Sequence, residues 1–142
     1  MKYGGTLISV SDMERAKDFY GRVMEQKVEM DLGTHVSFEG GISLQSDYEA
    51  LVGVKLEARE RPNNFQLYFE VEDLEHWEKK LKSTEGIEFI HGSKEYPWGQ
   101  RVMRFYDPDK YIVEVSESME SVAKRFLAQG LSVEETAERI MY

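Results

Sequence analysis

The chain contains two copies of one short segment, and this repeat limits the folds open to it. Residues 10–16 read Val-Ser-Asp-Met-Glu-Arg-Ala, and residues 71–77 read Val-Glu-Asp-Leu-Glu-His-Trp. Each copy follows a β-prone apolar run and precedes three further strand-like stretches. Self-similarity of this kind is typical of folds built from repeated units. The sequence therefore predicts two similar halves with a cleft between them.

This repeat predicts an α+β fold in which two tandem βαβββ modules form a curved, barrel-like mixed sheet with a central cleft. The first module spans about residues 1–46 and the second about 65–116, with residues 47–64 as the connector. We expect residues 1–116 to form a single domain. Apolar spacing in residues 117–142 predicts a C-terminal extension of two helices.

Helix-start signals occur both in the repeat and near the C-terminus. Ser11 and Glu14 have the spacing of a capping box, and so do Ser132 and Glu135. In this motif each side chain satisfies a backbone N–H that the first turn of a helix leaves open. We expect helices to begin at both places.

Composition excludes several classes of partner. Acidic residues outnumber basic ones by 27 to 18, which gives a formal net charge of −9. Nucleic acids and anionic membranes are bound by clustered Lys and Arg, so neither is expected as a partner. Cysteine is absent from the sequence, which excludes disulfides and thiolate chemistry. No apolar run has membrane-spanning length, and we expect a cytoplasmic protein.

Three longer motifs follow one another along the chain. They are Val-Ser-Asp-Met-Glu-Arg-Ala-Lys-Asp-Phe-Tyr at 10–20, Tyr-Pro-Trp-Gly-Gln-Arg-Val at 96–102 and Phe-Tyr-Asp-Pro-Asp-Lys-Tyr-Ile-Val-Glu-Val at 105–115. Together they resemble the glyoxalase/bleomycin resistance/dioxygenase superfamily, also called the vicinal oxygen chelate fold. The resemblance covers about residues 5–116. That superfamily includes isomerases, dioxygenases, thiol transferases and drug-binding proteins, so the fold does not decide the function.

The resemblance implies four positions at which metal-using members hold one divalent ion. In each half, one position lies seven residues before the aspartate of the repeat, and these positions are Gly5 and Gln66. The other lies late in the last strand of the half, at Gln45 in the first half and Glu114 in the second. Gly5 has no side chain, and two amides with one carboxylate and no histidine bind transition metals weakly. We therefore predict no cofactor. The alternative is a divalent metal held by Glu114, Gln66 and Gln45.

Alternation along the strands predicts which side chains share the cleft with Glu114. Tyr68 follows Gln66 by two positions, so both are expected on the cleft side. Pairing across the tight turn at 107–110 is expected to add three residues of the preceding strand, namely Arg101, Met103 and Phe105.

Glu114 is the first candidate for a catalytic role. A carboxylate that is buried without a metal must pair, accept hydrogen bonds or keep its proton. Arg101 is its expected partner. Two interpretations stay open, a structural Arg–Glu bridge across the hairpin and a general base or ligand anchor.

Two further candidates belong to the loop that holds Tyr-Pro-Trp-Gly at 96–99. His91 ends the strand before this loop, which makes it a candidate for proton transfer; its alternative is a surface or hydrogen-bonding role. Trp98 is either a lid over a planar ligand or an anchor for its own loop.

The first hypothesis for function is a small-molecule-binding protein without a catalytic metal, resembling the drug-sequestering members of the superfamily. The alternative is a metal-dependent lyase, isomerase or dioxygenase acting on a small oxygenated substrate, so catalysis stays an open question. A third is an interaction module whose tail helices dock a partner. The resemblance also implies a homodimer. The expected ligand-binding residues are Gln45, Gln66, Tyr68, Trp98, Arg101, Met103 and Phe105, with Glu114 and His91 as catalytic candidates.

Overall fold

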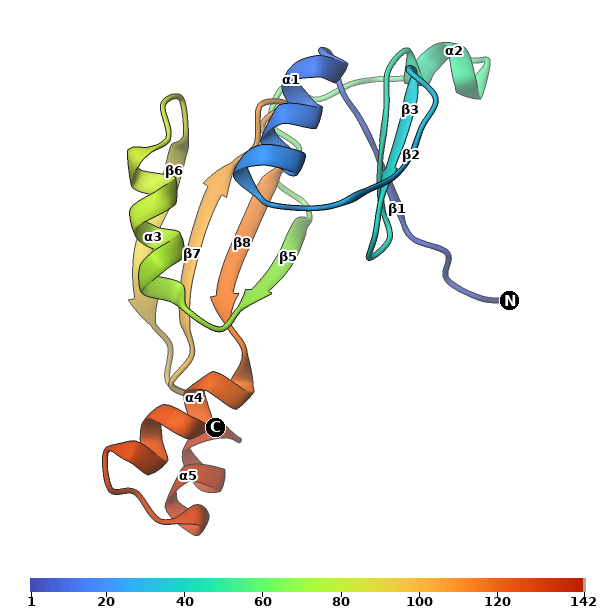
Figure 1. The fold of residues 1–142 in the computed structure, drawn as a ribbon. Helices are drawn as coiled ribbons and strands as arrows, with labels where there is room; N and C mark the ends of the chain where they lie inside the picture. Colours follow the sequence, from blue (N-terminus) through green and yellow to red (C-terminus); the bar gives the residue numbers. More distant parts are fainter. Residues whose placement is uncertain (142) are drawn as a thin grey trace. The chain divides into compact units, whose positions relative to one another are not determined.

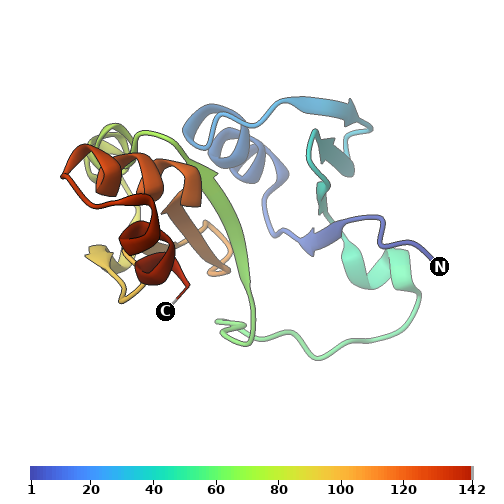
Figure 2. The same ribbon diagram turned by 90° about the horizontal axis from the view of Figure 1, so that it is seen from below.

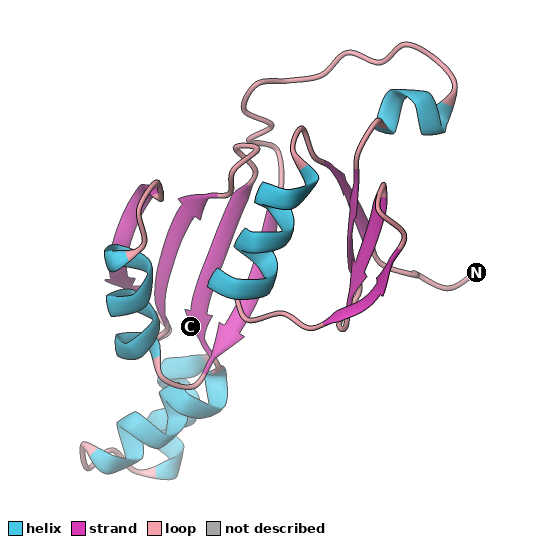
Figure 3. Ribbon diagram, turned by 45° about the horizontal axis from the view of Figure 1, so that its top comes forward, coloured by secondary structure: helices cyan, strands magenta, loops and turns pink. Residues whose placement is uncertain are grey.

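The computed structural model describes residues 1–141 and divides into two compact units (Figure 1). One unit comprises residues 1–62 with 107–110, and the other comprises residues 63–106 with the chain from 111 onward. Each unit contains one four-stranded mixed sheet and a helix that follows its first strand (Figure 3). The predicted α+β class and the two βαβββ modules are confirmed.

The first sheet has the strand order β1-β4-β3-β2, with β1 and β4 parallel and the other pairs antiparallel. Ile8, Val36 and Leu44 are buried on the helix-covered side of this sheet. The buried Tyr20 hydroxyl donates to Asp107 Oδ2 at 2.7 Å, which ties the 107–110 turn into this unit. Its elements are β1 Thr6–Ser9, α1 Met13–Asp18, the π-helix η1 Phe19–Val23, β2 Val28–Asp31, β3 His35–Phe38 and β4 Ile42–Gln45.

The second sheet repeats the same order as β5-β8-β7-β6, again with one parallel pair. Helix α3 crosses one face of it (Figures 1 and 2) and buries Leu74 and Leu81. On that face Met103 and Phe105 of β7 and Val113 and Val115 of β8 are apolar and buried, which provides the core of the unit. The elements are β5 Gln66–Val71, α3 Leu74–Ser83, β6 Glu88–Glu95, β7 Arg101–Tyr106 and β8 Ile112–Glu117.

One of the two predicted capping boxes is confirmed and the other is wrong. At the second, the Ser132 hydroxyl accepts from Glu135 N while the Glu135 carboxylate accepts from Ser132 N. At the first, Asp12 caps α1 by accepting from a backbone N–H, and the Ser11 hydroxyl instead donates to Asp109 Oδ1 at 2.8 Å. The carboxylate of Asp12 is the stronger acceptor for the helix terminus, which frees Ser11 for the turn.

The connector contains the short helix α2 Tyr48–Val52, and the C-terminal region forms α4 Met119–Ala128 and α5 Val133–Ile140. The two C-terminal helices pack against each other (Figure 1). Within residues 1–141, no helix combines the length and the apolar character that crossing a membrane requires.

Gly5 is a point where two backbones approach closely. Its φ is +135°, Thr6 N donates to Gly41 O at 2.9 Å, and a Cβ on residue 5 would lie closer than 3.0 Å to Gly41 O. We expect Gly5→Ala to lower the free energy of unfolding by about 1–3 kcal/mol, because it adds both strain and overlap. Chemical denaturation followed by circular dichroism measures this. Gly4→Ala is the control, since nothing lies within 4 Å of its Cβ position; equal losses for both variants would contradict the prediction.

Candidate functional site

The register of the second sheet decides which side chains share a face with Glu114. Arg104 lies directly opposite Glu114 across β7 and β8, and Tyr68 lies opposite it across β5 and β8. His91 on β6 is in turn opposite Arg104. Directly opposed residues project from the same face of a sheet. All four strands therefore contribute side chains to one polar cluster.

The prediction that three residues of β7 share this face is wrong. Tyr106 pairs with Ile112, so Tyr111 belongs to the loop and the hairpin connection is one residue longer than the tight turn that was expected. The cause is Lys110, whose φ of +67° places it in the left-handed region after the turn that Lys110 N closes on Asp107 O. A shift of one residue moves every side chain to the opposite face. The residues it moves are Arg101, Met103 and Phe105.

Arg104 binds the carboxylate at the centre of the cluster. Its Nη2 donates to Glu114 Oε1 at 2.5 Å and its Nε donates to Gln66 Oε1 at 2.9 Å. Gln66 Nε2 donates to the same Glu114 Oε1 at 2.9 Å, and the Ser116 hydroxyl donates to Oε2 at 2.6 Å. The Glu114 side chain is only 6% exposed, against 26% for Arg104. The buried negative charge is thus neutralised, and both of its oxygens accept hydrogen bonds.

The other terminal nitrogen of Arg104 binds two further residues. Nη1 donates to the Tyr96 hydroxyl at 2.6 Å and lies 3.1 Å from His91 Nε2. His91 Nδ1 lies 2.8 Å from the Gly92 carbonyl oxygen, which can only accept. This places the imidazole proton on Nδ1 and leaves the lone pair of Nε2 facing the guanidinium. His91 therefore belongs to the cluster and supports the orientation of Arg104.

Aromatic side chains border the cluster through the loop at 96–100. Tyr96 and Trp98 stack with ring centroids 5.0 Å apart and an interplanar angle of 26°. Trp98 Nε1 donates to Gln100 Oε1 at 2.9 Å, and Gln100 Nε2 donates to the Tyr68 hydroxyl at 3.3 Å. Tyr68 is 48% exposed, so an aromatic surface remains open beside the charged centre.

Arg101 lies on the opposite face and does not contact Glu114. It donates from Nη1 to Glu75 Oε1 at 2.5 Å and from Nε to the buried Glu117 carboxylate. This donation from Arg101 holds the pKa of the Glu75 carboxyl below its usual value. The expectation that Arg101 is the partner of Glu114 is therefore wrong, and Arg104 takes that place.

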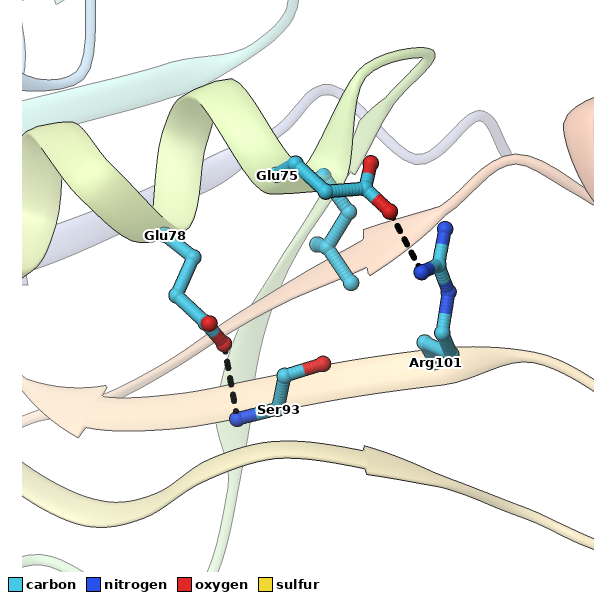
Figure 4. Close-up of a pocket in the computed structure, with 5 residues that line it drawn as sticks. Glu75, Glu78, Ser93 and Arg101 are labelled. Carbon is cyan, nitrogen blue, oxygen red and sulfur yellow. Dashed lines mark hydrogen bonds and ion pairs between the residues drawn. The ribbon is translucent and has the colours of Figure 1, made fainter.

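A small hollow of about 60 Å³ lies beside Arg101 (Figure 4). Its charged groups pair with protein atoms, since Glu78 Oε2 accepts from Ser93 N at 3.1 Å and Glu75 accepts from Arg101. The hollow is lined by Leu74, Glu75, Glu78, Ser93 and Arg101.

The residues at the two metal positions of the first half offer little to a cation. Gly5 has no donor atom, and Gly41 O fills the space of its Cβ. Gln45 is buried, with Oε1 3.0 Å from His35 Nδ1 and Nε2 donating to the next carbonyl at 2.9 Å. Gln45 therefore satisfies its hydrogen bonds inside its own unit.

In the second half the metal positions are already used by a protein cation. Gln66 Oε1 and Glu114 Oε1 both accept N–H groups of Arg104. In residues 1–141, no three His, Asp or Glu side chains lie close enough to hold a metal together. The donor set consequently does not fit a divalent ion that needs several free oxygens or imidazoles.

Residues 3–120 match the family model described as Glyoxalase-like domain. The chain belongs to this family. A crystal structure of a protein of unknown function from Agrobacterium tumefaciens str. C58 is 32% identical, with a TM-score of 0.76 over 83% of this chain and 94% of that one. The glyoxalase-like domain and its superfamily, the glyoxalase/bleomycin resistance/dioxygenase proteins, are thus confirmed.

More distant structures share the fold of this glyoxalase-like domain. A glyoxalase/bleomycin resistance protein/dioxygenase from Nocardioides is 20% identical, with a TM-score of 0.65 over 82% of this chain and 83% of the other. A lactoylglutathione lyase from Agrobacterium tumefaciens is 22% identical, with a TM-score of 0.64 over 82% and 93%. No curated protein matches the sequence.

Sequence reasoning missed Arg104 and Tyr96. The expected register puts the neighbours of Arg104 on the cleft side, whereas the longer loop pairs Arg104 itself with Glu114. A signal was present in the sequence, since Arg104 is a cation of β7 that lies between the apolar Met103 and Phe105. Tyr96 carried no comparable signal, because loop conformation decides where it points.

Removing Arg104 should leave Glu114 buried without a counter-charge. We expect Arg104→Met to lower the free energy of unfolding by about 3 kcal/mol or more, and Arg104→Met combined with Glu114→Gln to lower it less. Denaturant unfolding of the single and double variants measures the coupling. Arg22→Met is the control, because Arg22 pairs with Asp18 at an exposed position and should cost less than about 1 kcal/mol. A double variant as unstable as the sum of the singles would contradict the pairing.

Tyr68 should titrate above the ordinary tyrosine pKa. Burial raises its pKa, and the negative charges of Glu70 and Glu114 raise it further, against a lowering by the Gln100 hydrogen bond. The folded state therefore keeps the proton, and this stabilisation is complete below about pH 10 and is lost as the pH rises through the folded pKa. Glu70→Gln should lower the Tyr68 pKa. The absorbance of tyrosinate measures this pKa, and Tyr68→Phe isolates the signal of Tyr68. The exposed Glu85→Gln is the control. Equal shifts in Glu70→Gln and Glu85→Gln would refute the assignment.

Proposed function

We propose that this glyoxalase-like domain binds a small organic molecule without using a catalytic metal, on the face of the second sheet that carries Glu114. The observation behind the proposal is the contact of Arg104 with Glu114 and Gln66. An arginine here supplies the positive charge that the carboxylate needs. The site then works by shape, aromatic contact and hydrogen bonding, as ligand-binding sites do.

The surroundings of Arg104 indicate the kind of ligand. Tyr68 is 48% exposed, and the stacked rings of Tyr96 and Trp98 border the same cluster. Aromatic rings favour flat, partly apolar molecules. Because Arg104 and Glu114 neutralise each other, the ligand needs no strong net charge, and polar groups on it would meet the Tyr68 hydroxyl and the exposed Gln66. Gln66, Tyr68 and Trp98 thus remain our proposed ligand residues, with Glu114 as anchor.

The roles of the remaining candidates follow from where they lie. His91 accepts from Arg104, so we propose an orienting role for it in place of proton transfer. Gln45 belongs to the first unit and stays a proposed ligand residue only through the family resemblance. Met103 and Phe105 are fully buried, and Arg101 pairs on the opposite face, so none of these three is kept.

A metal titration tests the proposal against its rival, a metal-dependent lyase, isomerase or dioxygenase. We expect tag-free protein to contain no stoichiometric metal and to take up none when titrated calorimetrically with Mn²⁺, Fe²⁺, Ni²⁺ and Zn²⁺. The physical reason is that binding would have to displace Arg104 from two oxygens. Glu70→Gln serves as a matched carboxylate control, because Glu70 of β5 lies on the same face of the sheet as Glu114. Uptake of one equivalent that Glu114→Gln abolishes and Glu70→Gln preserves would establish the rival function.

A ligand screen tests the positive half of the proposal. Planar aromatic compounds, neutral and cationic, are added in thermal-shift measurements. At least one class should raise the melting temperature by several degrees, because binding to the folded state stabilises it, and Tyr68→Ala should remove the effect. The proposal fails if no compound in either class stabilises the protein.

The proposal includes a homodimer in the cytoplasm. Support for a second copy comes from the exposed apolar side chains along β2 and after it, Val28, Met30 and Leu32, on an edge strand of the first sheet. The absence of cysteine is compatible with a reducing compartment.

A further inference from the structure

Apart from the first two residues of α4, the C-terminal helices lie beyond the match to the glyoxalase-like domain, which ends at residue 120. The Agrobacterium protein of unknown function is matched over 94% of its length by 83% of this chain. Ser118 caps α4 by accepting from Ser121 N at 3.1 Å, directly after β8. The extension is therefore joined to a strand of the candidate site through the single residue Ser118.

Arg125 of α4 connects this extension to the loop at 96–100. Its Nη2 donates to the Gly99 carbonyl oxygen at 2.5 Å and lies 3.2 Å from Glu117 Oε1, while Nη1 donates to Glu95 Oε1 at 3.1 Å. The Glu117 side chain is 1% exposed. A buried carboxylate at the end of β8 thus fixes the guanidinium, and the guanidinium holds both ends of the segment that carries Tyr96.

Phe126 packs against the same loop. Gly99 has a φ of +86°, and a Cβ there would lie closer than 3.0 Å to the Phe126 ring. The ring itself is buried, and Arg139 of α5 lies over it at 5.0 Å. Loop and helix therefore approach more closely than any side chain at position 99 would allow.

The opposite side of this loop reaches the ligand face. Tyr96 accepts from Arg104 Nη1 at 2.6 Å, and Gln100 donates to the Tyr68 hydroxyl. Two backbone hydrogen bonds close the loop, Tyr96 N to Gln100 O at 2.9 Å and Gly99 N to Tyr96 O at 2.8 Å. A displacement at Gly99 is consequently carried to Tyr96 and Gln100, because the loop has few internal degrees of freedom.

We propose that Arg125, supported by Phe126, is a positioning residue for the ligand face: α4 sets the place of Tyr96 and Gln100, and through them the orientation of Arg104 and Tyr68. What the face binds rests on the function proposed above; the coupling from tail to face does not. Arg125 acts without reaching the ligand, since its partners are Glu95, Gly99 and Glu117, and none of these contacts Arg104 in the described hydrogen bonds.

Two spectroscopic signals test the coupling without any ligand or metal. The first is the fluorescence of Trp98 in a Trp77→Phe background, with quenching by acrylamide. The second is the NMR signal of the Arg104 Nε–H, assigned by its loss in Arg104→Lys. Arg125→Met should roughly double the quenching constant of Trp98 and shift or broaden the Arg104 signal. Lys124→Met should leave both unchanged, because Lys124 is the neighbouring cation of α4 and pairs only with Glu120 among the described ion pairs.

The proposal is overturned if folded Arg125→Met leaves both signals at their original values, or if Lys124→Met moves them equally. Should Arg125→Met fail to fold, Arg125→Lys replaces it, because lysine keeps the charge beside Glu117 but cannot span Gly99 and Glu95 together. It should move both signals in the same direction by a smaller amount, and unchanged signals would again refute the coupling. Neither readout involves a ligand. A negative ligand screen would therefore count against the proposed function and would not affect the test of the coupling.

Discussion

The pairing of Arg104 with Glu114 is the interaction on which the candidate site depends. A carboxylate that is 6% exposed needs a counter-charge or hydrogen-bond donors to offset the cost of its burial. One guanidinium meets this need and also orders Gln66, Tyr96 and His91, because its planar array of N–H groups points in fixed directions. Side chains from the other three strands of the sheet therefore contact Arg104, and the open aromatic surface lies beside it.

A guanidinium and a metal ion at such a place differ in what they offer a ligand. A divalent ion with free coordination positions binds and polarises substrate oxygens. Arg104 directs its Nε, Nη1 and Nη2 donors to protein acceptors, so it supplies charge balance and rigidity. Charge balance and rigidity are the properties that the proposed ligand-binding function uses.

The two βαβββ modules and the tail helices could be predicted because the repeat and the apolar periodicity encode them locally. Glu114 and Gln66 were singled out through the family resemblance. Arg104 could not be predicted, because the face of β7 depends on the conformation of a single loop residue: Lys110 takes a positive φ, for which glycine or asparagine is the usual sequence signal. Both Arg101, expected on the wrong face, and Arg104, overlooked, trace to this one residue. The contacts of Tyr96 depend on tertiary packing against α4, which no local pattern records.

Gly5 and Gly99 show one constraint acting at two places. At each, the absent side chain lets another part of the chain approach, Gly41 O in the first case and the Phe126 ring in the second. A donor at position 5 would therefore require the backbone between β1 and β4 to move as well as a new side chain. By the same reasoning, the loop at 96–100 packs closely against α4 because position 99 has no side chain. Close packing at these glycines thus limits which groups the domain can present, independently of the charges at its centre.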